Sequence, residues 1–223
     1  MSSSKTQHSW NVSAQEAIKI QKRLREEIDL SDALEHIRLI AGVDVAVSQP
    51  EKKVFAAAVV LDFGSLATVS KAFSVAQSGF PYVPGLLSFR EGPAVLRALE
   101  NLKPSPDLVM LDGQGVAHPR RMGIATHLGL LLDIPTIGCA KSRLVGEYGE
   151  PGLEKGDWEY LRDREEIIGV VLRTRREVKP VFVSVGHRIT LHSAVYYVLQ
   201  CCRGFRITEP VRAAHRLAAH AVR

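Results

Sequence analysis

The chain has 223 residues, of which 46% are hydrophobic, so it is long enough to bury a full core in one α/β domain. Lys and Arg outnumber Asp and Glu by 29 to 24, and the resulting net charge of +5 fits a polyanionic partner better than an acidic one. No apolar run reaches the length of a membrane span, and the N-terminal residues lack the apolar core of a signal peptide, so we expect no membrane partner and a cytoplasmic protein.

The N-terminal part of the sequence predicts a helix followed by three antiparallel strands. Ser13 and Glu16 have the spacing of a capping box, and apolar residues at helical spacing follow, which predicts a helix over residues 13–30. Residues 1–12 are expected to form a flexible N-terminus. Short turn signals separate the next three strand-like segments, which indicates antiparallel hairpins. These segments cover residues 37–47, 53–62 and 66–76.

Helical and strand patterns then alternate, which implies parallel strands joined by right-handed crossovers. The pattern predicts helices over residues 90–102 and 121–132 and short buried strands over residues 107–111 and 135–139. Three antiparallel strands followed by parallel strand-helix units describe a ribonuclease-H-like mixed sheet with flanking helices. In such a sheet Asp44 on the first strand and Asp112 at the end of the fourth would lie side by side.

The C-terminal part is less regular. A polar, glycine-rich stretch over residues 145–165 predicts a long loop, and a further pair of strands and two helices are expected after it. These elements cover residues 167–173, 181–185, 191–202 and 209–221. No composition shift marks a domain boundary, so residues 1–223 are expected to form a single domain. Because they lack metal-ligand spacing, Cys139, Cys201 and Cys202 are expected to be buried, reduced thiols.

Three acidic residues are the main candidates for a functional site. Asp44 and Asp112 follow apolar runs, and Glu91 is expected to open a helix. Carboxylate oxygens without nearby thiolates suit Mg²⁺ or Mn²⁺ rather than zinc. Such an ion can polarise a phosphoryl oxygen, activate a water and stabilise the leaving 3′-oxygen, which predicts phosphodiester cleavage. Each acid taken singly is also typical of a strand end or a helix cap.

Longer segments carry a resemblance to a known family. They are GVDVAV, PYVPGLLSFREGPAVL, PDLVMLDGQGVAHPRRMGIATHLGLLLDIPTIGCAKSRL, VSVGHRITLHSA and CCRGFRITEPVRAAH. With these segments in this order, the chain closely resembles the endonuclease V family of inosine-directed repair nucleases. The resemblance implies a Mg²⁺-dependent enzyme that binds DNA containing deoxyinosine, and we expect this enzyme to be a monomer. It also implies cleavage of the second phosphodiester bond 3′ to the lesion, which leaves 3′-hydroxyl and 5′-phosphate ends and does not remove the base.

The resemblance also implies roles for five catalytic residues. Asp44, Glu91 and Asp112 would be the metal-binding carboxylates. His215 matches a position near the metal and would be either a ligand or a group that positions water. Lys141 matches a lysine beside the scissile phosphate, where its ammonium would stabilise developing negative charge.

Substrate binding is expected from two further segments. Pro81-Tyr82-Val83-Pro84 resembles the family's wedge, in which two prolines stiffen the loop so that the tyrosine can enter the base stack. Glycines allow close approach of backbone groups to a base edge, and a pocket with donors for O6 and no room at C2 would select hypoxanthine. The expected pocket glycines are Gly85, Gly113 and Gly115. Leu87 and His118 are expected to line this pocket or contact phosphate, and phosphate contacts are also expected from Arg120, Arg121, Lys141 and Arg143.

Two alternatives remain open from the sequence. An inosine-specific endoribonuclease could use the same metal centre, because motifs do not reveal contacts to the 2′-hydroxyl. A non-catalytic inosine-binding module is the other alternative, although the presence of Asp44, Glu91, Asp112 and Lys141 argues against it.

Overall fold

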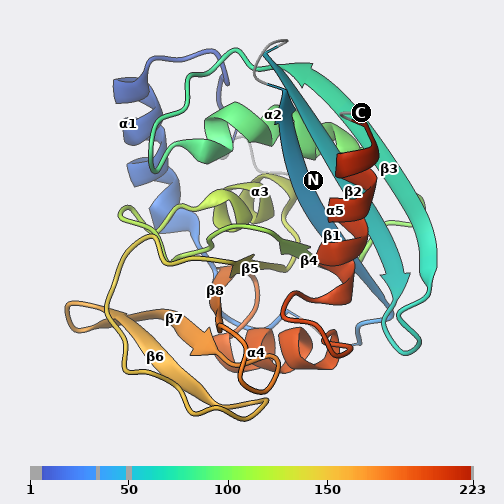
Figure 1. Cartoon of the computed structure of the whole chain (residues 1–223). Coiled ribbons are helices and arrows are strands. Elements are labelled where there is room, and N and C mark those ends of the chain that lie inside the picture. The colour runs from blue at the N-terminus through green and yellow to red at the C-terminus, as the bar shows by residue number, and fades with distance from the viewer. Residues whose placement is uncertain (1–6, 34–35, 49–51, 222–223) are drawn as a thin grey trace.

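The computed structural model describes residues 7–33, 36–48 and 52–221, and one mixed sheet forms its centre (Figure 1). The strand order is β3-β2-β1-β4-β5-β8-β7-β6. The first three strands pair antiparallel, whereas β1, β4 and β5 pair parallel, which confirms the predicted mixed α/β architecture. The strands are β1 (Leu39–Ser48), β2 (Lys53–Asp62), β3 (Thr68–Gln77), β4 (Leu108–Leu111), β5 (Thr136–Ala140), β6 (Trp158–Asp163), β7 (Glu166–Leu172) and β8 (Val181–His187).

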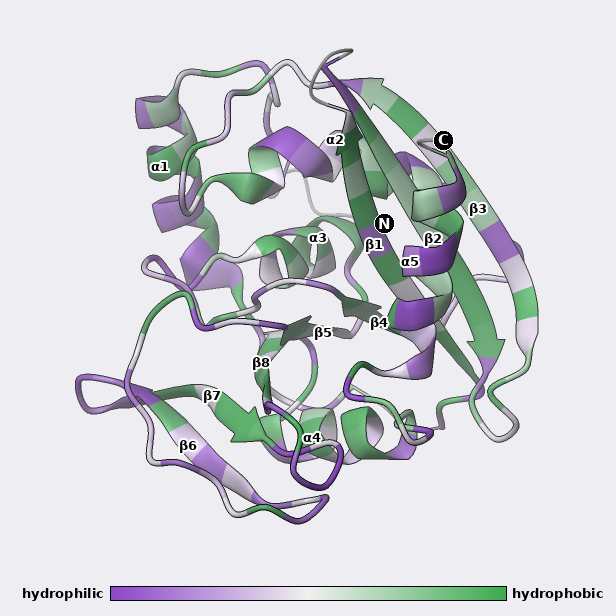
Figure 2. Ribbon diagram, in the orientation of Figure 1, coloured by the Kyte–Doolittle hydropathy of each residue, from purple (hydrophilic) through white to green (hydrophobic). Residues whose placement is uncertain are grey.

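Helices cover both faces of the sheet. Two of them, α2 and α3, pack on one face, while α4 and α5 pack on the other, and α5 lies directly over β1 and β2 (Figure 1). Hydrophobic residues concentrate in β1 and β2, between these helical layers (Figure 2). The helices are α1 (Ala14–Leu24), continued by a 3-10 turn (Arg25–Glu27), α2 (Leu87–Glu100), α3 (Ile124–Leu132), α4 (Leu191–Gln200) and α5 (Glu209–Ala221).

Strand β1 contributes side chains to the hydrophobic cores on both faces of the sheet, because successive side chains point to opposite faces. Ile40 belongs to the core under α4 and α5, whereas Ala41 and Val43 belong to the core under α2 and α3. A Cβ on Gly42 would lie 1.9 Å from the carbonyl carbon of Pro210. Only glycine therefore lets the start of α5 lie this close to β1, and this contact directs α5 along the strand toward Asp44.

Several predicted boundaries differ from the structure. The prediction of a loop over residues 145–165 is wrong for β6, an edge strand that pairs antiparallel with β7 and leaves Trp158 and Tyr160 exposed. Helix α2 begins at Leu87 rather than Arg90, so Glu91 lies in its second turn and does not open it. Helix α3 begins only at Ile124, because Arg121 adopts a left-handed φ of 57°.

The remaining expectations concern the cysteines, the membrane and the N-terminus. All three cysteines are buried and free, and burial raises the pKa of each thiol. In the described part of the chain, no helix has the length and apolar character needed to cross a bilayer. Of the N-terminal residues expected to be flexible, 1–6 lie outside the described residues. His8 and Trp10 pack against Phe89 of α2 and His127 of α3.

Candidate active site

Asp44 and Asp112 meet at the centre of the sheet. Parallel pairing places Val43 opposite Leu111, and the backbone N–H of Asp112 donates to the carbonyl of Val43 at 3.2 Å. The charge of Asp44 contributes to raising the pKa of the Asp112 carboxyl, as a like charge nearby does. The sheet topology therefore brings together two of the three acids that the sequence singled out.

Glu91 approaches the same place from α2. Burial, opposed by the charge of neighbouring Arg90 and assisted by the charges of Asp44 and Asp112, raises the pKa of its carboxyl to about 7. Burial also raises the pKa of Asp112, against the effect of Lys141. The three carboxyl groups are thus close enough for their charges to act on one another.

Two further side chains, Lys141 and His215, contact two of these carboxyl groups. Lys141, directly after β5, forms an ion pair with Asp112. His215, from the middle of α5, places its Nδ1 2.7 Å from Oδ2 of Asp44. The structure therefore gathers all five residues expected to be catalytic, from two strand ends, one strand interior and two helices.

The donor set suits a hard divalent cation, since it offers carboxylate oxygens without thiolates. In residues 7–33, 36–48 and 52–221, no three His, Cys, Asp or Glu side chains already converge at metal-ligand spacing. Asp112 and Asp44 instead contact Lys141 and His215. Burial raises the pKa of both Glu91 and Asp112, and a divalent cation bound there would favour their ionised forms.

A cavity of about 370 Å³ opens beside Asp112. This volume is in the range of small-molecule sites. Of the residues expected to bind substrate, its wall contains Tyr82, Val83, Pro84, Gly85, Leu87, Gly113 and His118. Pro81 and Gly115 are not part of this wall. Gly115 instead packs against β8, where a Cβ would lie 2.0 Å from the carbonyl oxygen of Val185.

Two helix N-termini face this cavity without a side-chain cap. The N-cap residues Leu86 of α2 and Gly123 of α3 accept no hydrogen bond through a side chain. The first helical residues, Leu87 and Ile124, belong to the cavity wall, and the described residues supply no hydrogen-bond partner for their N–H groups. Free N–H groups at helix N-termini are ready donors for a ligand oxygen or nitrogen.

The carbonyl of Gly85 is held from three sides. It accepts hydrogen bonds from Gln21 Nε2 at 3.0 Å, His118 Nε2 at 2.9 Å and the Arg120 guanidinium at 2.7 Å. Gly85 itself has a φ of +77°, which favours glycine. Sequence reasoning missed Gln21, since nothing in a helical glutamine indicates that it is fully buried and bonded to another segment.

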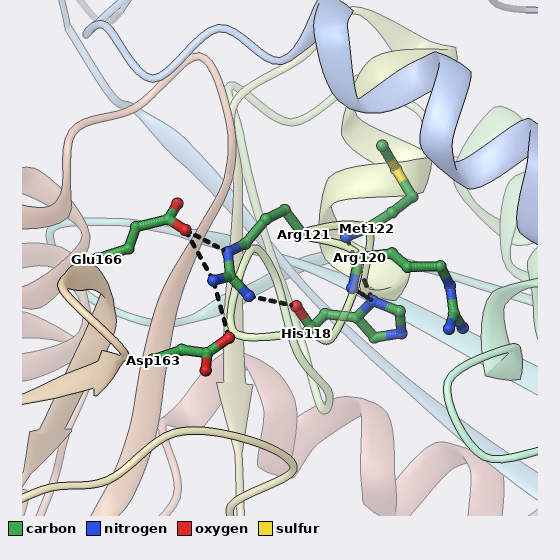
Figure 3. Close-up of polar contacts among 6 residues, drawn as sticks. All are labelled: His118, Arg120, Arg121, Met122, Asp163 and Glu166. Atoms are coloured by element: carbon green, nitrogen blue, oxygen red, sulfur yellow. Dashed lines mark hydrogen bonds and ion pairs between the residues drawn. The ribbon is translucent and has the colours of Figure 1, made fainter.

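Two of the expected phosphate-contacting arginines have other roles. Arg121 is buried, forms ion pairs with Asp163 and Glu166, and donates to the carbonyl of His118 at 2.8 Å (Figure 3). Arg120 donates its Nε to Gln21 at 2.5 Å besides contacting Gly85. Both side chains therefore stabilise the cavity wall, and Arg121 links this wall to the β6–β7 hairpin through its ion pairs.

His118 remains a neutral member of the wall. Burial, with the nearby charge of Arg120, lowers the pKa of His118 to about 4. Its Nδ1 receives the backbone N–H of Arg120 at 3.2 Å (Figure 3). The ring therefore accepts through Nδ1 and donates through Nε2 to Gly85, which fixes its tautomer.

Tyr82 lies at the mouth of the cavity with 68% of its surface exposed. The guanidinium of Arg90 lies 5.9 Å from its ring centroid. An aromatic ring so exposed on a proline-flanked loop is available for stacking on a base.

Comparison with known proteins agrees with this geometry. The sequence profile of the family described as Endonuclease V matches residues 22–216. The chain belongs to the endonuclease V family. It is 51% identical over 213 residues to the endonuclease V of Alkalilimnicola ehrlichii, covering 95% of this chain and 94% of the relative.

Solved structures of endonuclease V share the fold. The Streptomyces avermitilis protein superimposes with a TM-score of 0.92 at 44% identity, covering 96% of this chain and 95% of that one. The Ciona intestinalis endonuclease V superimposes with a TM-score of 0.81 at 30% identity, covering 93% and 97%. That protein was solved in complex with a 24mer DNA containing an inosine followed by a ribo-adenosine.

Proposed function

We propose that this endonuclease V family member recognises deoxyinosine in DNA and hydrolyses the second phosphodiester bond 3′ to it. The reaction depends on Mg²⁺, which Mn²⁺ can replace, and leaves 3′-hydroxyl and 5′-phosphate ends. The observation that carries this proposal is the position of Asp112, which belongs both to the carboxylate cluster and to the cavity wall. A base bound in the cavity would lie close to the cleavage centre.

Asp44, Glu91 and Asp112 are proposed to hold the metal. A bound Mg²⁺ would supply Lewis acidity toward a phosphoryl oxygen and lower the pKa of an attacking water. Lys141, which is more exposed than Asp112, would turn its ammonium toward the scissile phosphate and stabilise developing negative charge. His215 orients the carboxylate of Asp44 through their 2.7 Å contact.

The cavity wall is proposed to read the flipped base. Hypoxanthine carries an oxygen at C6, and the free N–H groups of Leu87 and Ile124 are donors for its polar edge atoms. Gly85 and Gly113 keep the wall close to the ring, since a Cβ at Gly113 would lie 2.7 Å from the side chain of Ile124. Tyr82 would fill the gap left in the stack, and stacking on an aromatic ring returns about 1–3 kcal/mol per base.

Inosine-containing RNA is a second proposed substrate. The DNA bound to the Ciona intestinalis relative carries a ribonucleotide directly after its inosine, so that protein accommodates a 2′-hydroxyl there. This chain is proposed to admit RNA strands as well as DNA.

Matched end-labelled DNA and RNA strands with a single inosine test both substrates. In the presence of Mg²⁺ we expect a nick one nucleotide beyond the inosine in DNA, which EDTA abolishes, and the rate ratio shows whether RNA is also cut. Binding of inosine without any cut would contradict the nuclease proposal and support a binding module.

A further inference from the structure

A chain of hydrogen bonds runs from the cavity wall to the N-terminal segment. Ser88, in the first turn of α2, belongs to the wall and places its Oγ 2.9 Å from Nδ1 of His127. Nε2 of His127 lies 2.7 Å from Nε2 of His8, and Nδ1 of His8 lies 2.9 Å from the carbonyl oxygen of Ser9. Four groups are thus linked in a single line.

The Ser9 carbonyl, at the N-terminal end of this chain of hydrogen bonds, determines which atom donates in each of them. The Ser9 carbonyl can only accept, so Nδ1 of His8 carries a hydrogen. A neutral His8 then offers a lone pair at Nε2, which requires the hydrogen of His127 to reside on its Nε2. Nδ1 of His127 is left as an acceptor, so the hydroxyl of Ser88 must donate to it.

The surroundings keep both imidazoles neutral. Burial lowers the pKa of His8 against the effect of its hydrogen bond to the Ser9 carbonyl, and the charge of Arg23 on α1 adds to the lowering. Burial lowers the pKa of His127 to about 3, with additional contributions from His8 and His118. His127 is fully buried in α3, so no solvent is available to satisfy a different proton arrangement.

We propose that Ser88 is a specificity residue, whose Oγ, with its hydrogen directed to His127, offers only lone pairs to the base. This inference rests on the proposed function. Hypoxanthine has a hydrogen on N1 beside its C6 oxygen, whereas adenine has an unprotonated N1 beside an amino group. The N–H of Leu87 followed by the acceptor Oγ of Ser88 matches the first pattern and opposes the second.

The N-terminal segment is the support of this arrangement. Trp10 packs on Gly92 of α2, where a Cβ would lie 2.7 Å from the indole ring. The ring centroids of Trp10 and Phe89 lie 5.7 Å apart. The indole centroid also lies 4.6 Å from the imidazole of His8. These contacts hold His8 against His127, so His8 is a positioning residue for Ser88 although it is not part of the cavity wall.

Comparing cleavage at deoxyinosine with cleavage at purine deoxyriboside distinguishes a hydrogen-bond acceptor role of Ser88 from a packing role. Purine deoxyriboside lacks the C6 oxygen and has an unprotonated N1, so an acceptor at Ser88 disfavours it relative to deoxyinosine. The measured quantity is the cleavage rate at inosine divided by the rate at purine. Ser88→Ala is expected to lower this ratio about 5- to 30-fold, the effect of leaving one hydrogen bond unmade.

His8→Phe keeps an aromatic ring in the N-terminal segment but removes the acceptor for Nε2 of His127, so the hydrogen of His127 is no longer confined to that nitrogen. This variant is also expected to lower the ratio. Ser9→Ala retains the backbone carbonyl and is the matched control, with an unchanged ratio. An unchanged ratio in Ser88→Ala, even if both substrates are cut more slowly, would overturn the acceptor role. If the wild-type protein made no inosine-dependent cut, the proposed function would fail together with this inference.

Discussion

The imidazole of His215 lies 2.7 Å from the carboxylate of Asp44, although 171 positions separate them in the sequence. The contact requires α5 to lie close to β1, and this close approach of the helix to the strand is possible because Gly42 has no side chain. A backbone position two residues before Asp44 thus controls the surroundings of the carboxylate.

Gly42→Ala should therefore disturb both stability and cleavage. Its Cβ would meet the carbonyl of Pro210 at 1.9 Å, so α5 must move away from β1. We expect a loss of about 1–3 kcal/mol in the free energy of unfolding, measured by urea denaturation, together with slower cleavage. Gly79→Ala is the control, because a Cβ there has no neighbour within 4 Å. Equal stability of the two variants would refute the close-contact argument.

His215→Ala should weaken metal binding without unfolding the protein, because the imidazole is largely exposed. Loss of a group that orients a metal-binding carboxylate costs about 10–100-fold in metal affinity or activity. The measurement is the Mg²⁺ concentration that gives half-maximal cleavage. His220→Ala, on the exposed side of the same helix, should behave like the wild type. An identical Mg²⁺ dependence in both variants would remove the role of His215.

Lys141→Gln should slow the chemical step, since it removes a positive charge from the position proposed to face the scissile phosphate. Loss of one such group lowers kcat by about 10²–10³-fold. Single-turnover cleavage at saturating Mg²⁺ measures this step, and Lys141→Arg should retain part of the rate. Full activity of the Gln variant would place the scissile phosphate elsewhere.

Glu91 should make Mg²⁺ binding dependent on pH. Its folded pKa of about 7 exceeds its unfolded value of 4.5, so the folded carboxyl holds a proton between these pH values. Protons compete with the metal for this group, and the half-saturating Mg²⁺ concentration should rise as pH falls below 7. Without metal, the contribution of Glu91 to stability is greatest below pH 4.5 and is lost as pH rises through 7.

Urea unfolding in EDTA checks the sign of this effect. The stability of the wild type relative to Glu91→Gln should decrease between pH 5 and pH 8, since the Gln side chain cannot ionise. A difference that stays constant with pH would show that Glu91 is ionised throughout.

Tyr82→Ala should weaken binding of inosine strands while sparing the carboxylate cluster. Stacking of a base on an aromatic ring contributes about 1–3 kcal/mol, which corresponds to about 5- to 150-fold in affinity. Fluorescence anisotropy with an inosine-containing strand measures the change. Tyr82→Phe should bind like the wild type, and so should Tyr196→Ala, which removes an exposed tyrosine from α4. Wild-type affinity in Tyr82→Ala would exclude a wedge role.

The sequence predicted the meeting of Asp44 and Asp112, because the strand order makes β1 and β4 neighbours and places the end of β4 beside the middle of β1. It did not predict β6, since an edge strand with Trp158 and Tyr160 exposed lacks the buried alternation that identifies strands. It also placed the start of α2 too late, because Leu86 offers no side-chain cap. That missing cap is a feature of the cavity, so a local sequence rule failed at the proposed base-binding site.

Long-range polar contacts were beyond sequence reasoning. Nothing local indicates that Gln21 would hold Gly85, or that Arg121 would pair with Asp163 and Glu166 instead of facing solvent. These contacts join segments between 42 and 64 positions apart, and only the folded arrangement of α1, the wall and the β6–β7 hairpin creates them.

The most direct test of the central claim is to map cleavage of an end-labelled duplex that contains one deoxyinosine, using the wild type and Asp112→Asn. With Mg²⁺ the wild type should nick the second phosphodiester 3′ to the lesion, and the variant should bind the same duplex without cutting it. Inosine-dependent cleavage by Asp112→Asn at the wild-type rate would contradict the joint role of this carboxylate in cavity and catalysis.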